Sequence, residues 1–240
     1  MKILALETST EYCSVALWQD GITLAHSELA GQKHSELLMP MLAALLQDAG
    51  IGIQDTGCRM QNIDGIAFGS GPGSFTGVRI ACGVAQGLAL GADLQVAGIC
   101  TLQALAQGSG HARVIAALDA RMGEIYCAAY EKQNEGWTTV YEPCLCKPED
   151  APVVAGADWF GAGSGFAAFG DALQKRYTGQ LNSVDADAVP QAADIAALGA
   201  LQFASGLGVD AALAQPFYLR DKVALKTFER EQLAAEKQLK

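Results

Sequence analysis

The stretch MKILALETSTEYCSVALW, residues 1–18, predicts two strands joined by a tight turn. Its apolar run at residues 3–6 is typical of a buried strand. Beyond the turn, every second residue is again apolar: Cys13, Val15 and Leu17. Asp20-Gly21 then favours a two-residue hairpin into a third strand over residues 22–29. We therefore expect the chain to open with three consecutive antiparallel strands.

Helices and strands alternate after this meander. Apolar periodicity predicts helices over residues 35–48 and 75–90, and a further helix opens at Thr101. Short apolar runs predict strands over 63–68 and 94–99. A meander followed by alternating elements predicts an α/β fold, in which a mixed sheet carries helices on its faces.

The opening pattern returns near the middle of the chain. A strand is predicted over 113–118, a turn over 119–123, and an alternating strand after it. Shifted by 112 residues without a gap, Glu7 falls on Asp119. The same shift places Cys13, Val15 and Leu17 on Ile125, Cys127 and Ala129. The position of the acidic residue and the alternation of apolar residues in the second strand both recur at this offset, which favours two lobes with the same fold.

These patterns divide the chain into an N-terminal lobe at 1–110, a smaller and less regular lobe at 111–220, and a charged tail at 221–240. Within the second lobe, the sequence predicts a strand at 153–155, a turn at 161–165, a helix at 166–175 and a final helix at 191–203. We expect this last helix to pack back on the first lobe.

Composition and charge indicate the class of protein. The chain has 240 residues, half of them hydrophobic, and a net charge of −10. No apolar run reaches the roughly 20 residues of a membrane helix, and the first residues lack the order of a signal peptide. We expect a soluble, cytoplasmic protein with no membrane contact. Its acidity argues against autonomous nucleic-acid binding, so any nucleic acid is expected to be held mainly by another subunit.

Cysteines and histidines give no metal site. The seven cysteines are odd in number and lie mostly in apolar runs, which predicts buried free thiols. Cys144 and Cys146 have the wrong spacing for a zinc knuckle, and no second pair accompanies them. The three histidines include no pair at helical spacing: His26, His34 and His111. The sequence therefore offers no complete catalytic set and no metal ligands.

The stretch GSGPGSFTGVR, residues 69–79, has the glycine content of a phosphate-binding turn. It is not a P-loop, because Gly77 is followed by Val78 and Arg79 in place of Lys and Ser or Thr. Two interpretations remain open. The stretch is a tight turn in which Ser74 or Thr76 caps the next helix, or it contacts an anion or a partner. The second interpretation uses the turn Gly71, Pro72, Gly73 and Ser74.

The helix after this turn carries Gly83, Gly87 and Gly91 on one stripe. Glycine at that spacing lowers helix propensity but lets another helix approach closely. The stripe packs against the chain's own first helix or against a helix of another protein. The sequence leaves both interpretations open.

Two further turns are candidate ligand sites. Glu7, Thr8 and Ser9 end the first strand, where an acid and hydroxyls can orient a metal-bound water and a phosphate. This turn has no glycine, so a capping or hairpin role is favoured. The turn around Gly163 is compatible with an adenosine cradle, but a plain loop is favoured.

Four segments together closely resemble the bacterial TsaB (YeaZ) family, in this order: MKILALETSTEYCSVALW, GSGPGSFTGVRIACGVAQGLAL, LDARMGEIYCAAY and QPFYLR. The resemblance runs from Met1 to about Arg220. It implies a two-lobed, ribonuclease-H-like fold related to the actin, sugar-kinase and heat-shock-chaperone ATPases. The duplicated hairpins agree with such a fold.

The resemblance also implies a function. It places the chain in the formation of threonylcarbamoyladenosine beside the anticodon of tRNAs that read codons beginning with A. A TsaC-type enzyme makes the threonylcarbamoyl-adenylate, and the catalytic paralogue TsaD transfers the group using a metal bound by a histidine pair. TsaB-like proteins pair with TsaD, and the ATPase TsaE joins them. The resemblance therefore implies a non-catalytic subunit that contacts tRNA only through the complex and forms a homodimer when alone.

The implied interface is a helix bundle shared with TsaD. On the first helix it uses His34, Leu38, Met41 and Leu45, and on the second Gly83 and Gly87. The glycine turn and Arg79 are expected to fix the second helix and to touch the partner or a nucleotide. No cofactor is expected to bind firmly to this chain, although ATP or ADP at the complex interface is compatible with the resemblance.

Two rival functions are a stand-alone kinase or ATPase and a glycoprotease-like metallopeptidase. Glu7 stands where ATPases of the superfamily usually have Asp, and the turn after it lacks their glycine. Both departures argue against autonomous ATP hydrolysis. No residues in the sequence support peptidase chemistry.

Overall fold

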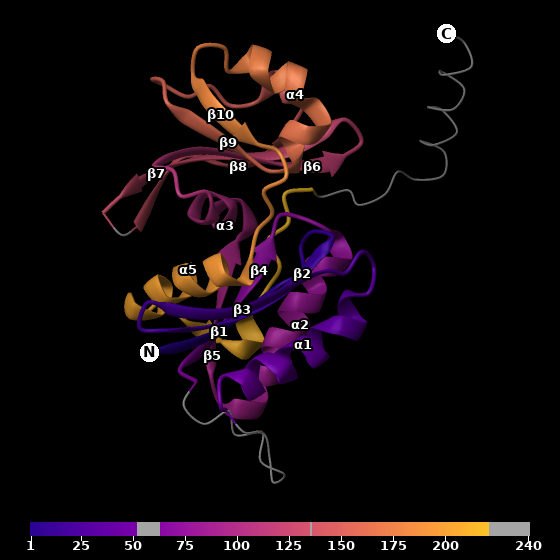
Figure 1. Cartoon of the computed structure of the whole chain (residues 1–240), viewed down its shortest axis with the longest axis vertical. Coiled ribbons are helices and arrows are strands. Elements are labelled where there is room, and N and C mark those ends of the chain that lie inside the picture. The colour runs from indigo at the N-terminus through magenta and orange to yellow at the C-terminus, as the bar shows by residue number, and fades with distance from the viewer. Residues whose placement is uncertain (52–62, 135, 221–240) are drawn as a thin grey trace, which may run out of the picture.

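The computed structural model describes residues 1–51, 63–134 and 136–220. Figure 1 shows two twisted sheets, one above the other, with helices α3 (Thr101–Gly108) and α5 (Ala192–Ala204) between them. The predicted two-lobed α/β architecture is confirmed. Cys58 and the tail predicted at 221–240 lie outside the described residues.

The first sheet has the strand order β11-β5-β4-β1-β2-β3. Its strands are β1 (Lys2–Glu7), β2 (Tyr12–Gln19), β3 (Ile22–Leu29), β4 (Gly65–Gly71), β5 (Gln95–Cys100) and β11 (Val209–Asp210). The first three form the predicted antiparallel meander, and β4 and β5 run parallel to β1. β4 continues three residues beyond its predicted end, so Gly69, Ser70 and Gly71 are strand residues.

Helices cover both faces of the first sheet. α1 (His34–Asp48) and α2 (Phe75–Ala92) bury one face around Leu6, Val15 and Phe68. α5 covers the other face, as expected of the last helix. By length and composition alone α2 could cross a membrane, but its buried side packs on β4 as a core helix does.

The second sheet repeats this topology with the order β10-β9-β6-β7-β8. Its strands are β6 (Arg113–Arg121), β7 (Glu124–Gln133), β8 (Gly136–Cys146), β9 (Trp159–Ala162) and β10 (Leu181–Asp185), with the helix α4 (Ser164–Arg176) and the short helix η1 (Pro148–Asp150). A second short helix, η2 (Ala211–Leu213), packs on α2 in the first lobe. β6 to β8 form a meander, and β9 and β10 run parallel to β6. The strand predicted at 153–155 is wrong, because no strand forms there. The sequence patterns missed β8, β9 and β10.

The two hairpins pair in registers that differ by one residue. In the first, Leu6 lies opposite Val15, whereas in the second it is Ala117 that lies opposite Cys127. The ungapped shift, which puts Leu6 on Leu118, is therefore wrong by one residue for the first strand of the hairpin. It is correct for the second strand, whose apolar residues face the helix-covered core in both lobes.

The predicted match of the two acids is wrong for the same reason. Glu7 lies opposite Ser14, and the residue in the equivalent place, opposite Tyr126, is Leu118. Asp119 comes one residue later, and successive strand side chains point to opposite faces. The two acids consequently occupy different environments: the Glu7 residue is 1% exposed, whereas the Asp119 side chain is 19% exposed.

Candidate functional site: the interlobe cleft and the outer face of α2

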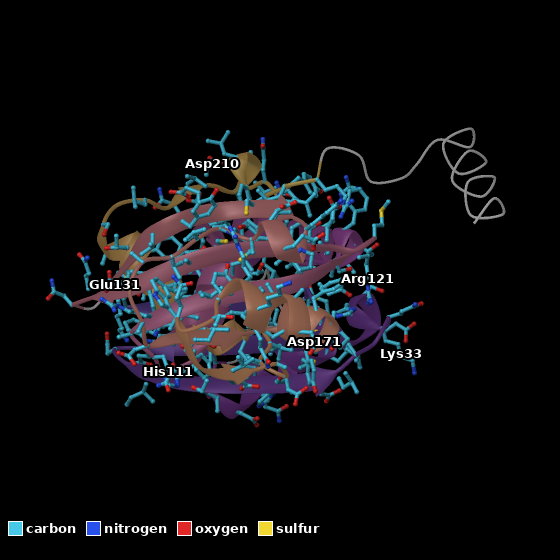
Figure 2. All side chains as sticks on the ribbon, turned by 90° about the horizontal axis from the view of Figure 1, so that it is seen from above. Lys33, His111, Arg121, Glu131, Asp171 and Asp210 are labelled. Atoms are coloured by element: carbon cyan, nitrogen blue, oxygen red, sulfur yellow. The ribbon has the colours of Figure 1, made fainter. Side chains whose placement is uncertain are left out.

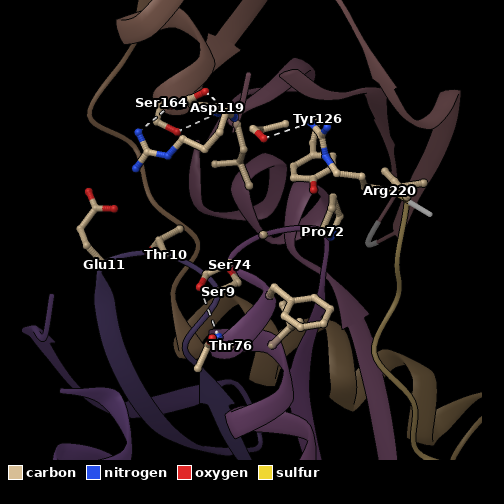
Figure 3. Close-up of a pocket in the computed structure, with 18 of the residues that line it drawn as sticks. Ser9, Thr10, Glu11, Pro72, Ser74, Thr76, Asp119, Tyr126, Ser164 and Arg220 are labelled. Atoms are coloured by element: carbon tan, nitrogen blue, oxygen red, sulfur yellow. Dashed lines mark hydrogen bonds and ion pairs between the residues drawn. The ribbon is translucent and has the colours of Figure 1, made fainter. Parts of the chain in front are cut away.

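A cleft of about 1120 Å³ lies between the two lobes (Figure 3). The first lobe lines it with the turn after β1 and the start of α2, and the second with the β6–β7 hairpin and Ser164. Residues 217–220, near the end of the described chain, form a further part of its lining. The cleft thus gathers segments that are far apart in the sequence.

The start of α2 is closed against the turn after β1. Ser74 caps the helix, since its Oγ accepts a hydrogen bond from the Gly77 N–H at 3.3 Å. The Ser74 N–H donates to the Ser9 carbonyl at 2.7 Å, and the Thr8 hydroxyl donates to the Gly77 carbonyl at 2.7 Å. Several polar groups of this helix end therefore have partners within the chain. Thr76 and Gly73 line the cleft beside them.

Glycine is required where these segments touch. A Cβ atom added at Gly77 would overlap the Thr8 carbonyl oxygen, and one at Gly69 would overlap Oε2 of Glu7. Gly71, which precedes Pro72 in the turn, has a φ of +111°, a conformation that favours glycine. The glycine stretch therefore serves close packing of backbone and side chains inside the first lobe.

Glu7 is buried beside this stretch and does not line the cleft. Its Oε1 accepts a hydrogen bond from the Ser9 N–H, while Oε2 has no partner. Burial raises the pKa of Glu7 from an ordinary 4.5 to about 7. The Ser9 hydroxyl is also buried without a partner. Ser9 lines the cleft, whereas Glu7 does not.

Asp119 belongs to the cleft-facing hairpin of the second lobe. Its carboxylate accepts from the Arg121 N–H at 2.8 Å and pairs with the Arg121 guanidinium at 3.1 Å. Its own N–H donates to the Ser164 Oγ at 3.1 Å (Figure 3). Gly163, with a φ of +106°, precedes α4 and packs against the Ala117 carbonyl. The acid is thus held by its own turn.

The C-terminal segment bridges the two lobes, which the sequence patterns missed. The Phe217 N–H donates to the Ser70 carbonyl at 2.7 Å, and the Tyr218 hydroxyl accepts from Arg79 Nε at 2.6 Å. On the second lobe, Arg220 pairs with Glu124 at 2.7 Å. These residues belong to the quoted segment QPFYLR, but spacing alone cannot bring together residues about a hundred positions apart.

Arg79 lies over the Phe75 ring, with its guanidinium carbon 3.6 Å from the ring centroid. The same guanidinium lies 5.5 Å from the centroid of the Tyr218 ring. Arg79 therefore holds the first turn of α2 against the C-terminal segment. This agrees with its expected role in fixing the second helix, although the sequence did not identify Tyr218 as its partner.

The predicted interface residues of α1 are buried within this chain. Leu38, Met41 and Leu45 pack in the core between α1, α2 and the first sheet. His34, at the start of α1, is largely buried and lines the cleft. The His34 ring also contacts the Tyr12 carbonyl, with Nε2 at 3.2 Å from the oxygen. A partner can therefore meet only the opposite side of α1, where Met39 is 48% exposed.

The glycine stripe of α2 faces outward. A Cβ atom added at Gly83, Gly87 or Gly91 would meet no atom of residues 1–51, 63–134 or 136–220 within 4 Å. The interpretation that this stripe packs against the chain's own first helix is therefore wrong. Leu90, next to the stripe on the same helix, is 77% exposed.

The part of the chain that the structure describes contains no cluster of side chains that could bind a metal ion. No three His, Cys, Asp or Glu side chains among these residues lie close enough together to hold a metal ion. Several charged side chains point outward from the rim of the molecule instead, among them Lys33, Glu131 and Asp210 (Figure 2).

Two lobes of repeated topology around a central cleft define a protein of the actin-like, ribonuclease-H-like class. A protein-family model described as "TsaD: tRNA N6-adenosine threonylcarbamoyltransferase" matches residues 25–228. The chain is 41% identical over 234 residues to "tRNA threonylcarbamoyladenosine biosynthesis protein TsaB" of Escherichia coli K12, covering 94% of this chain and 97% of that protein. The chain belongs to the TsaB (YeaZ) family.

Other relatives agree with this assignment. The TsaB protein of Haemophilus influenzae is 35% identical over 239 residues, covering 94% of this chain and 96% of that protein. The solved structure "YeaZ from Pseudomonas aeruginosa" superposes with a TM-score of 0.81 at 40% identity. The superposition covers 91% of this chain and 99% of that structure. Sequence and fold therefore indicate the same family.

Proposed function

We propose that this chain is a cytoplasmic, non-catalytic subunit of the machinery that forms threonylcarbamoyladenosine in tRNA. It is required for threonylcarbamoyl transfer to the adenosine next to the anticodon in tRNAs that read codons beginning with A. It acts by binding a TsaD-like catalytic paralogue, and a TsaE-like ATPase joins the pair. Family membership and the printed names of the relatives support this proposal.

The observation that carries the proposal is the exposed stripe of α2. Gly83 and Gly87 leave the helix backbone open along one side, where no side chain of the described residues covers it. A helix of another protein can approach such a surface closely and pack ridges into the groove. The adjacent Leu90 is exposed, and burial of its apolar surface against a partner helix would stabilise the complex.

The buried residues of α1 support this surface from beneath. Because Leu38 and Leu45 anchor α1 in the core, α1 and α2 form one rigid layer over the first sheet. A partner helix pair then packs on the outer side of that layer, against α2 and against Met39 of α1. The same surface accounts for a homodimer when the paralogue is absent.

A non-catalytic role is supported by the cleft itself. Glu7 is buried and does not line it, and the Ser74 N–H and the Thr8 hydroxyl are bonded within the chain. Any ATP or ADP is therefore assigned to the composite interface, with no nucleotide held firmly by this chain alone. The net charge of −10 favours tRNA contact through the catalytic partner.

The Gly87→Leu variant tests the interface. A leucine at this position adds a side chain where nothing lies within 4 Å, so the isolated fold is retained, but the close helix approach is blocked. Titration calorimetry with the TsaD-like paralogue should show affinity lowered at least about tenfold, a loss of about 1.4 kcal/mol. Gly170→Leu, an equally open helical glycine in α4, should leave the affinity unchanged.

Equal affinity of Gly87→Leu and the unaltered chain would exclude this face as the interface. Reconstitution of tRNA modification with and without the chain tests the function separately. Modification should depend on the chain, and the chain alone should turn over no nucleotide. Magnesium-dependent turnover by the purified chain would instead support the stand-alone ATPase.

A further inference from the structure

Cys144 and Cys146 form a thiol pair on the free edge of the second sheet. β8 is the last strand of that sheet, and residues two apart in a strand point to the same face. Their sulfur atoms lie 4.0 Å apart. Both residues are partly exposed, whereas Cys13, Cys82 and Cys127 are buried. The pair therefore combines proximity with access from solvent.

A bulge in β8 precedes the pair. Opposite β7, Tyr141 pairs with Ala129 and Cys144 pairs with Cys127, so β8 carries one extra residue in this interval. Bulges bend a strand, increase its local twist and redirect the side chains beside them. The bulge therefore lies where it can change the direction in which the two thiol side chains point.

A disulfide between the two residues requires the strand to bend locally. At a rise of about 3.2–3.4 Å per residue, the Cα atoms of Cys144 and Cys146 are separated by at most about 6.4–6.8 Å. Disulfides span Cα separations of about 4.4–6.8 Å. Disulfides also need Cβ separations of about 3.5–4.5 Å, which residues two apart in an extended strand exceed. The bond therefore forms only with a local bend of the backbone, and strained bonds of this kind are the more easily reduced ones.

We propose that Cys144 and Cys146 are a reversible redox pair that forms an intramolecular disulfide with oxidised glutathione or a similar small disulfide. The Cys144 thiolate attacks one sulfur of the small disulfide, forms a mixed disulfide and releases one thiol. The Cys146 thiolate then attacks the Cys144 sulfur and releases the second thiol. Two protein thiols lose two electrons and two protons, and one small disulfide becomes two thiols.

The neighbouring groups favour Cys144 as the first nucleophile. As a thiolate it accepts a hydrogen bond from the Cys146 thiol, which lowers its pKa. Burial raises the pKa of Cys127 to about 12, and its sulfur lies 3.8 Å from the Tyr177 hydroxyl. Cys127, although opposite Cys144 in the sheet, is therefore a poor competitor for the exchange.

The test uses the whole folded chain incubated with excess oxidised glutathione, quenched in acid, alkylated and digested with trypsin. Residues 133–175 form one peptide, because Pro148 follows Lys147 and blocks cleavage there. That peptide contains only two cysteines, Cys144 and Cys146. In most molecules it should lose two hydrogen atoms and escape alkylation. Reduced glutathione in excess should restore both thiols.

Two cysteine variants test whether the disulfide bond involves Cys144. Cys144→Ser should abolish the loss of two hydrogens, and the matched change Cys82→Ser, at a buried cysteine on the first lobe, should leave it intact. The proposal is overturned if the peptide of the unaltered chain stays fully alkylated, or if it ends as a stable glutathione adduct. A cross-link from Cys144 to the peptide that contains Cys127 would also overturn it. This inference does not rest on the proposed function.

Discussion

Replacing Glu7 by glutamine should remove a pH dependence of stability that the buried carboxyl group creates. Glu7 is almost fully buried, faces Gly69 and has one oxygen without a partner. Burial raises the pKa of Glu7 to about 7, so the folded chain holds a proton that the unfolded chain releases near pH 4.5. The folded state binds more protons between these values, and the free energy of unfolding therefore falls as the pH rises.

The size of the effect follows from the two pKa values. Each unit between 4.5 and about 7 corresponds to about 1.4 kcal/mol, so the full cost above pH 7 is about 3 kcal/mol. Between pH 5 and pH 8 the chain should lose about 2.5 kcal/mol through this group alone. Glutamine has nearly the same shape and does not titrate, so Glu7→Gln should lack this loss.

Urea denaturation at pH 5 and pH 8, followed by tryptophan fluorescence, measures the difference. Burial also raises the pKa of Asp194, to about 6, and adds a slope of the same sign. Comparison of Glu7→Gln with the unaltered chain cancels that contribution, because Asp194 is present in both. Parallel changes in the two proteins, within about 0.5 kcal/mol, would show that Glu7 is charged in the folded state and would refute the reasoning.

Two other stability changes follow from the glycine stretch. Gly69→Ala forces a methyl group onto the Glu7 carboxyl group and should cost about 3 kcal/mol in urea denaturation. Adding Glu7→Ala to that variant should recover part of the loss, and a strictly additive double variant would contradict the overlap. Ser74→Ala removes the α2 cap and should cost about 1 kcal/mol, whereas Ser205→Ala, beyond the end of α5, should cost less.

The first lobe was predictable because its patterns are local. The meander is encoded by the apolar run of the first strand, the alternation of the second and the Asp20-Gly21 turn. The apolar stripe of α1 faces the core, as its spacing predicts. The second lobe carries weaker patterns. β8 and β10 are edge strands with largely exposed residues, and β8 contains Pro143, which favours an edge position. Such strands lack the apolar period on which the sequence prediction depends.

The site residues were harder to predict because their roles depend on register and on distant contacts. A one-residue difference between two similar hairpins separates the buried Glu7 from the cleft-lining Asp119, and no local pattern encodes that difference. The sequence predicts that Arg79 fixes the second helix and touches a partner or a nucleotide, but it does not predict the bond to Tyr218, which is 139 positions away. A contact at that separation follows only from the folded topology.

The glycine-rich stretch also shows why a phosphate loop and a packing junction look alike in sequence. Both need glycine where another group comes close to the backbone. In a phosphate loop that group is a ligand, whereas here it is the Thr8 carbonyl at Gly77 and the Glu7 carboxyl group at Gly69. Because the chain itself fills these places, the stretch fixes the start of α2 within the first lobe. By fixing the start of α2, the stretch also sets the position of Gly83 and Gly87 on the outer face of this helix. A partner helix is proposed to bind at these two glycines.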